Sequence, residues 1–270
     1  MTDVAGDFVA GRTVVVGLFD PNCERLLGRG TGTCVSICGR YLVATAGHLF
    51  IGVPEPYCVG VMPLTTTPSR EIFLATRHNR RGGGKTDPED VAWLELSVAA
   101  ARDLGREFLT LDGIEPHYAG AAGEPLFSYG FPEQEEITPK AHGQSEFGLS
   151  VQCYSTFVIP PTSIDPSCRP DPAFDIFARY STRPLDENLP EGRVPTLPGA
   201  PGLSGGGFWR VNVNKLGIWT PGDLKLVGIE HAWLPEDEWF RATKICHWLR
   251  LVAHDHPDLG SVIDPVLALP

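Results

Sequence analysis

The chain has 270 residues, of which 42% are hydrophobic, and it carries a formal net charge of −11. This length can hold one large domain or two small ones, with ample core in either case. The acidic balance disfavours non-specific binding to nucleic acid and docking on an anionic membrane surface. No apolar run is long enough to span a membrane. We therefore expect a soluble, globular protein with no nucleic-acid or membrane partner.

Runs typical of short β-strands recur along the whole chain, and 30 glycines and 25 prolines favour strands joined by turns over long helices. This spacing predicts an all-β barrel or sandwich. The predicted strands are Thr13–Leu18, Thr33–Ile37, Tyr41–Ala46, Tyr57–Met62, Glu71–Arg77, Val91–Leu96, Pro125–Tyr129, Val151–Val158, Ala173–Tyr180, Phe208–Val213 and Leu224–Ile229.

Near the end of the chain, Glu236–Ala253 has apolar residues at helical spacing. Acidic residues open it and Arg250 lies near its end, as the helix dipole favours. This pattern predicts a C-terminal helix packed on the second half of the protein. The proline-rich segment Pro160–Pro201 is interpreted as containing the extra residues, in surface loops, that lengthen the interval between Asp90 and Ser204.

The N-terminal segment Met1–Phe8 lacks the basic start and apolar stretch of a secretory signal. This predicts a cytoplasmic protein, unless the chain was trimmed at its start. The seven cysteines are odd in number and contain no Cys-x-x-Cys pair, so we expect mostly reduced thiols. A disulfide between Cys34 and Cys38 is a less favoured alternative. Cys/His spacing typical of a metal site is absent, so no zinc site is expected.

Three segments hold residues that could act together in catalysis. The run Gly199–Gly207 places Ser204 in a glycine-dense turn, where a hydroxyl can face outward beside backbone N–H groups. The run Tyr41–His48 is an apolar strand that ends in a small-residue turn and then His48. Asp90 begins another apolar strand. Each has an ordinary explanation when taken alone: a loop serine, a structural histidine and a turn aspartate.

Taken together, the three residues occur in the order His, Asp, Ser, and the order differs between unrelated folds that carry such a triad. They lie in the motifs Thr45-Ala-Gly-His48, Asp90-Val-Ala-Trp-Leu94 and Gly202-Leu-Ser-Gly-Gly206. This order and these motifs resemble the chymotrypsin/trypsin-like serine peptidase family. The interval from Asp90 to Ser204 is somewhat long for the family. Weaker similarities are the hairpin Gly30–Gly39, the strand Leu224–Ile229 and the turn Ser128–Pro132, which resembles bacterial members.

The resemblance implies two six-stranded antiparallel β-barrels with a C-terminal helix. The N-terminal barrel, residues 1–115, would carry His48 and Asp90, and the C-terminal barrel, residues 116–270, would carry Ser204. It further implies that Ser204 attacks a peptide carbonyl, His48 acts as the base and Asp90 orients His48. The N–H groups of Gly202 and Ser204 would form the oxyanion hole, and no cofactor or metal is expected. The substrate would be a protein or peptide.

Leu203 stands where digestive members of the family have the aspartate that pairs with a newly cut N-terminus. We therefore expect no activation by N-terminal cleavage, and either intrinsic activity or control by a regulatory protein partner. An intracellular bacterial effector or signalling protease is the interpretation that fits these features. Two alternatives remain: a catalytically silent binding module on the same fold, and an esterase of another fold.

Specificity is harder to predict. The floor of the substrate pocket would lie near Leu197 or Pro198, which carry no charge. Glu230 could favour a basic substrate residue, and His231 resembles a residue of glutamate-specific relatives but is one position out of step. Alternatively, strand alternation sends one of these two outward. Arg80–Lys85 is interpreted as a solvated turn or, alternatively, a regulatory loop.

Overall fold

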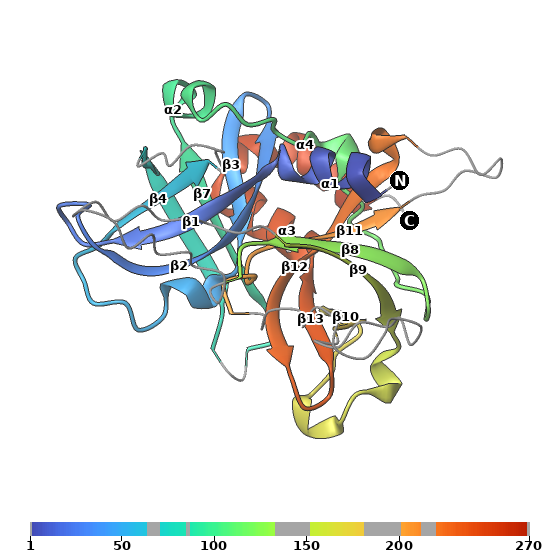
Figure 1. The fold of residues 1–270 in the computed structure, drawn as a ribbon. Helices are drawn as coiled ribbons and strands as arrows, with labels where there is room; N and C mark the ends of the chain where they lie inside the picture. The colour runs from blue at the N-terminus through green and yellow to red at the C-terminus, as the bar shows by residue number, and fades with distance from the viewer. Residues whose placement is uncertain are drawn as a thin grey trace.

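A computed structural model of the chain describes residues 2–63, 71–84, 87–132, 152–180, 201–211 and 220–268. These residues form an antiparallel sheet in the N-terminal half and a closed barrel in the C-terminal half, at the left and lower right of Figure 1. Within the part of the chain that the structure describes, no helix is both long and apolar enough to cross a membrane. The division of the chain into domains at residue 115 stays a prediction.

The N-terminal sheet has seven strands in the order β5-β4-β1-β2-β3-β7-β6. β2 and β3 are joined by a two-residue turn in which Cys38 and Gly39 both have positive φ, the geometry that matches the twist of a hairpin. The strands are β1 Thr13–Phe19, β2 Leu26–Ile37, β3 Arg40–Thr45, β4 Cys58–Pro63, β5 Phe73–Leu74, β6 Arg77–Gly82 and β7 Asp90–Leu96.

The prediction of a closed six-stranded barrel in this half was wrong, because the described strands form an open sheet of seven. The predicted strand Glu71–Arg77 is divided between the two edge strands β5 and β6. β6 consists of exposed and half-exposed polar residues and glycine, so it lacks the apolar alternation from which a strand is predicted.

The C-terminal half contains a closed barrel of six strands in the order β10-β13-β12-β11-β8-β9, as predicted. Its core holds Leu126, Phe208 and Phe240 on the inner face, together with Leu203 from the loop before β11. The strands are β8 Pro125–Gly130, β9 Gln152–Ile159, β10 Asp175–Arg179, β11 Gly207–Val211, β12 Leu224–Leu234 and β13 Trp239–Lys244.

The predicted C-terminal helix begins later than expected. Trp239–Lys244 is strand β13, which pairs with β10 and β12 after a tight turn in which Glu238 has a φ of 53°. A short apolar run does not distinguish a strand from a helix by its spacing alone, and here the two neighbouring strands decide. Helix α3 follows directly as Ile245–Asp255, and α4 is Pro257–Ala268.

Other helices were not predicted from the sequence. Helix α1 precedes the first strand and contacts β1 and β8, and α2 contacts β3. The remaining helices are α1 Thr2–Ala10, α2 Val98–Asp103 and the short 3-10 turns η1 Gly47–Phe50, η2 Leu111–Gly113, η4 Pro161–Ser163, η5 Pro166–Cys168 and η6 Pro221–Asp223.

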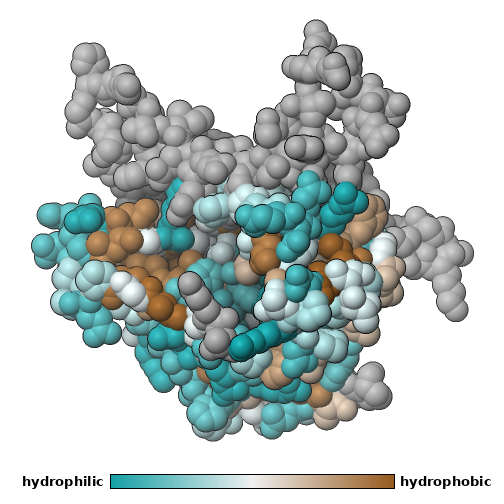
Figure 2. Space-filling view, turned by 90° about the horizontal axis from the view of Figure 1, so that it is seen from below, coloured by the Kyte–Doolittle hydropathy of each residue, from teal (hydrophilic) through white to brown (hydrophobic). Residues whose placement is uncertain are grey.

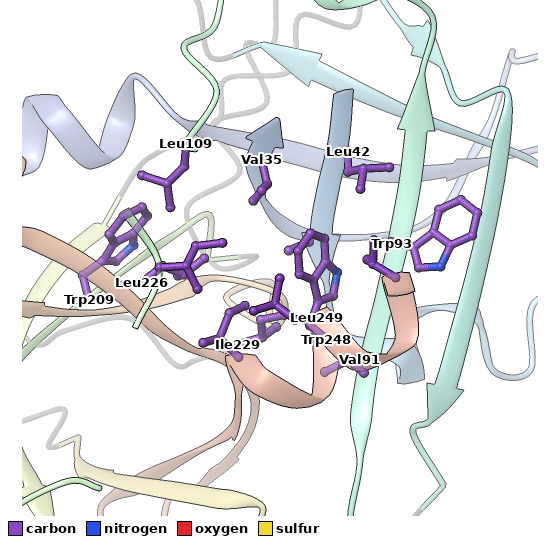
Figure 3. Close-up of a cluster of buried hydrophobic side chains, with 14 of the residues drawn as sticks. Val35, Leu42, Val91, Trp93, Leu109, Trp209, Leu226, Ile229, Trp248 and Leu249 are labelled. Carbon is purple, nitrogen blue, oxygen red and sulfur yellow. The ribbon is translucent and has the colours of Figure 1, made fainter. Parts of the chain in front are cut away.

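One hydrophobic cluster joins the sheet to the barrel. Figure 3 shows side chains of both halves meeting on helix α3, which contributes Trp248 and Leu249. The Trp248 indole N–H donates to the carbonyl oxygen of Ala92 in β7 at 2.9 Å. Helix α3 therefore packs on β7 as well as on the barrel strand β12. This places a rigid element directly behind the strand that begins at Asp90.

Candidate active site

His48 lies in the short turn η1, immediately after strand β3 ends at Thr45. The turn approaches β6 and β7 closely: a Cβ atom on Gly47 would lie 3.1 Å from Val91 O and 3.2 Å from Asp90 Oδ1. On the other side, a Cβ on Gly83 would lie 2.6 Å from the backbone N of His48. Glycines at both positions therefore let the His48 turn sit against the start of β7.

Asp90 holds His48 at two points. Its Oδ1 accepts a hydrogen bond from the His48 backbone N–H at 2.8 Å, and its Oδ2 lies 2.8 Å from His48 Nδ1. Because an ionised carboxylate only accepts hydrogen bonds, Nδ1 carries the proton in this pair. Nε2 of the neutral ring is then an unprotonated acceptor, as a general base requires.

Asp90 is buried, with 6% of its surface exposed. Burial alone would raise its pKa, but the hydrogen bond from His48 and the neighbouring His231 outweigh this, so the pKa of Asp90 lies below its usual range. The backbone N–H of Asp90 donates to Thr243 Oγ1 in β13 at 3.2 Å. The backbone of Asp90 is thus held from the barrel, while its carboxylate contacts His48 in the N-terminal half.

The segment Gly202–Gly206 is tied to strand β2 of the sheet. The backbone N–H of Thr31 donates to Ser204 O at 2.8 Å, and the Thr31 hydroxyl donates to Gly202 O at 2.9 Å. The N–H of Gly205 donates to Glu230 O at 2.7 Å, which joins the same segment to β12. The sequence similarity includes the Gly30–Gly39 hairpin, but it does not predict that Thr31 in this hairpin bonds to Gly202 and Ser204.

Ser204 and His48 belong to neighbouring segments. A Cβ on Gly30 would lie 2.5 Å from the Leu49 side chain and 2.7 Å from Ser204 O, so both segments meet at this point of β2. Between the described residues Ser204 and His48 no side-chain hydrogen bond is formed. Such bonds are commonly long in free enzymes and tighten when substrate binds.

Seen from below, the surface of the molecule is hollowed near its centre, between two areas of hydrophobic side chains (Figure 2).

The backbone N–H groups predicted for an oxyanion hole lie in the turn before β11. Within the described part of the chain, those of Gly202 and Ser204 donate to no other residue. Gly202 has a φ of 91°, a conformation that glycine adopts without strain. Leu203 between them is buried in the barrel core, so a hydrophobic contact anchors the turn.

Glu230 and His231 lie beside Asp90 because of a β-bulge. The pairing of β12 with β13 shifts between Glu230 and Ala232, and His231 is the extra residue. A bulge interrupts strict alternation and redirects a side chain. His231 Nδ1 lies 3.4 Å from Asp90 Oδ2. The alternative that one of these side chains points outward was wrong. Glu230 is buried, and the His231 side chain is only 9% exposed.

The surroundings of both groups disfavour their charged forms. Burial, followed by the negative charge of Asp90, raises the pKa of Glu230 well above its usual value. Burial lowers the pKa of His231 to about 4. Glu230 Oε2 has no hydrogen-bond partner among the described residues. Leu197 and Pro198, the other residues predicted for the substrate pocket, lie outside the described residues.

The segment Arg80–Lys85 is in part a strand. Arg80–Gly82 belongs to β6 and pairs with the start of β7, so the interpretation of this part as a solvated turn was wrong. Lys85 lies outside the described residues. In the segment Pro160–Pro201, the predicted strand Ala173–Tyr180 is confirmed as β10, and residues 181–200 lie outside the described part.

His247 on α3 stabilises the turn that leads into Asp90, a role that the sequence did not reveal. Its Nδ1 lies 3.0 Å from Glu89 Oε1 and its Nε2 lies 3.1 Å from Ala173 O, and the ring stacks on Phe174. Because both partners are acceptors, both ring nitrogens donate only in the imidazolium form. Burial lowers the pKa of His247, but Cys246, the Ala173 carbonyl and Glu89 outweigh it, so the pKa is raised.

We expect the free energy of unfolding to fall as the pH rises through the raised pKa of His247. The stabilisation is complete below the unfolded-state value near 6.5 and is lost above the folded-state value. The loss is at most that of one hydrogen bond to a charged group, about 1.5–3 kcal/mol. Urea unfolding at several pH values would measure it. His247→Gln, which does not titrate, is the control, and an identical pH dependence in both proteins would contradict the assignment.

Comparison with solved structures finds similar chains, and one of them is a protease. The crystal structure of the protease Anisep from Arthrobacter nicotinovorans aligns over 87% of this chain and 90% of that chain, with 13% sequence identity and a TM-score of 0.48. No protein-family model and no curated protein sequence matches the chain.

Proposed function

We propose that the chain is a serine endopeptidase of the chymotrypsin-like fold, with His48, Asp90 and Ser204 as its catalytic triad. The observation that carries the proposal is the double contact of Asp90 with His48, through the backbone N–H and through Nδ1, each at 2.8 Å. A carboxylate that only neutralised a charge would not need both contacts. Together they fix the position of the ring and leave Nε2 as the acceptor.

In the proposed reaction, Ser204 Oγ attacks the carbonyl carbon of a peptide bond and His48 Nε2 takes its proton. The carbonyl oxygen becomes an oxyanion, which the N–H groups of Gly202 and Ser204 stabilise. Loss of one such donor typically costs about 3–4 kcal/mol of transition-state stabilisation. His48 then gives its proton to the leaving amine, and water repeats the sequence on the acyl-enzyme. Asp90 stays ionised throughout and stabilises the imidazolium.

We expect a fluorophosphonate probe to label the wild-type protein covalently and Ser204→Ala not at all. The probe needs an activated serine hydroxyl, and the substitution removes that oxygen alone. Labelling would be measured by intact-protein mass spectrometry. Ser163→Ala, which changes an exposed serine in another turn, is the matched control and should be labelled like the wild type.

Two results would contradict the proposal. Labelling that persists in Ser204→Ala means that another residue is the nucleophile. A folded wild-type protein that is never labelled, with or without candidate protein partners, favours the alternative of a catalytically silent binding module. The observation behind this alternative is that the side chains of Ser204 and His48, both described, form no hydrogen bond with each other in the structure.

A further inference from the structure

The carboxylate of Asp90 lies between two imidazole rings. Its Oδ2 atom is 2.8 Å from Nδ1 of His48 and 3.4 Å from Nδ1 of His231. His48 approaches from the turn after β3, whereas His231 approaches from strand β12 of the barrel. The proposed reaction uses only the first ring, so His231 is a titratable group in contact with the proposed triad that has no assigned role.

A β-bulge brings His231 to this position. Its two neighbours in β12 pair with consecutive residues of β13, Ala242 and Arg241, so His231 has no partner of its own in that strand. A bulged residue is left out of the strand pairing, and bulges occur beside active sites, where they re-aim a side chain. The side chain that this bulge re-aims is the one that reaches Asp90 Oδ2.

The residue before His231 binds the turn that carries Ser204. The backbone N–H of Glu230 donates to Gly206 O at 2.8 Å, and Glu230 O accepts a hydrogen bond from the N–H of Gly205 at 2.7 Å. Two consecutive residues of β12 thus contact both parts of the proposed site. One binds the nucleophile turn through its backbone, and the next contacts the acid of the triad through its side chain.

The proton of the His231 ring is expected on Nδ1. Asp90 is ionised at neutral pH, because its pKa lies below the usual range, and a carboxylate only accepts hydrogen bonds. An unprotonated Nδ1 would present its lone pair to that negative charge. On the other side of the ring, Nε2 is buried and has no hydrogen-bond partner among the described residues. Because unpaired buried N–H groups are rarer than unpaired acceptors, a proton on Nε2 is disfavoured as well.

The charged groups around this ring come from four elements. Burial, the largest effect, lowers the pKa of His231 to about 4. Asp90 in β7 and Asp175 in β10 act in the opposite direction. Arg241 in β13 and His48 in η1 add to the lowering. Arg241 is bound to Asp175 by hydrogen bonds of 2.9 and 2.7 Å, so the effects of these two charges largely offset each other. The neutral ring is therefore favoured at neutral pH.

We propose that His231 is a positioning residue of the triad, whose Nδ1–H group holds Oδ2 of Asp90 in place for the ring of His48. This proposal rests on the proposed peptidase function. A neutral donor suits the role, because it fixes the carboxylate and leaves its negative charge to stabilise the His48 imidazolium. His231 acts through Asp90 and transfers no proton in the reaction.

Two substitutions separate hydrogen bonding from packing. In His231→Asn the side-chain amide nitrogen can take the place of Nδ1, so a donor is kept although the side chain is smaller. In His231→Leu the volume is nearly kept, but no donor remains. The rate of fluorophosphonate labelling of Ser204 would be measured across the pH range in which histidine titrates, with urea unfolding as the measure of stability. His117→Leu, which changes an exposed histidine that contacts Val266 O, is the matched control.

We expect His231→Leu to be labelled about 10-fold more slowly than the wild type, the effect of losing one hydrogen bond to a charged group. With one donor fewer, the carboxylate attracts the imidazolium proton more strongly, so the pH of half-maximal labelling should also rise. His231→Asn should stay within about 3-fold of the wild type, with its pH of half-maximal labelling unchanged. His117→Leu should match the wild type.

If His231 only fills space, the smaller asparagine should give the slower variant and neither pH profile should move. That result would overturn the proposal and leave the proposed function standing. A folded wild-type protein that no fluorophosphonate labels would contradict the proposed function, and this proposal with it.

Nitrogen NMR of the wild type is a second test, which depends neither on the folding of a variant nor on activity. At neutral pH we expect His231 to be neutral, with its proton on Nδ1 and with Nε2 unprotonated. A ring that carries its proton on Nε2, or one proton on each nitrogen, would overturn the proposal.

Discussion

Replacing Asp90 with asparagine is expected to lower kcat by about 10⁴-fold, the loss that this substitution causes in the triad on which the proposal is based. The side chain keeps its shape, so the His48 turn can remain in place. However, an amide can donate as well as accept, and an NH₂ group that faces Nδ1 favours the tautomer with the proton on Nε2. In that tautomer His48 cannot accept the proton of Ser204.

The effect would be measured as kcat on a peptide ester or peptide library substrate, with circular dichroism as the test of folding. Asp258→Asn is the matched control, because Asp258 is exposed and pairs with Arg40, at the opposite end of β3 from the His48 turn. It should leave kcat unchanged. A folded Asp90→Asn protein with kcat within ten-fold of the wild type would mean that Asp90 does not orient the base.

The sequence was sufficient for the parts of the candidate site that local pattern determines. The motif Thr45–His48 combines an apolar strand with a small-residue turn, and the structure has β3 followed by η1. Asp90 begins an apolar strand in the sequence and in the structure. Their contact was expected only from the resemblance, because the hydrogen bonds between His48 and Asp90 join segments that no local pattern connects.

Where long-range pairing decides the conformation, the sequence was insufficient. The run Trp239–Lys244 was predicted as helix, and it is a strand because β10 and β12 pair with it on both sides. His231 faces Asp90 because one extra residue interrupts the register of β12, and alternation along the strand cannot reveal a bulge. The contacts of His247 depend on where α3 packs, which the amphipathic pattern of the helix does not specify.

Gly205→Ala is expected to have the largest effect on stability, about 2–5 kcal/mol. Gly205 has a φ of 92°, which an L-amino acid with a side chain adopts only with strain. In addition, a Cβ at this position would overlap Thr31 O and Thr45 Oγ1 and would lie 3.0 Å from the carbonyl carbon of Thr31. Because two of these atoms belong to the backbone of a buried strand, they cannot move aside like the end of a flexible side chain.

Gly39→Ala separates the two causes of this effect. Gly39 has a similar φ of 80°, but a Cβ there would meet nothing within 4 Å. It should therefore cost only the conformational penalty, about 1–2 kcal/mol, as measured by urea unfolding. Since the clash at Gly205 would also push the Ser204 turn away from β2, fluorophosphonate labelling should fall in Gly205→Ala and persist in Gly39→Ala. Equal destabilisation in the two variants would show that the close contact between this turn and Thr31 does not exist in solution.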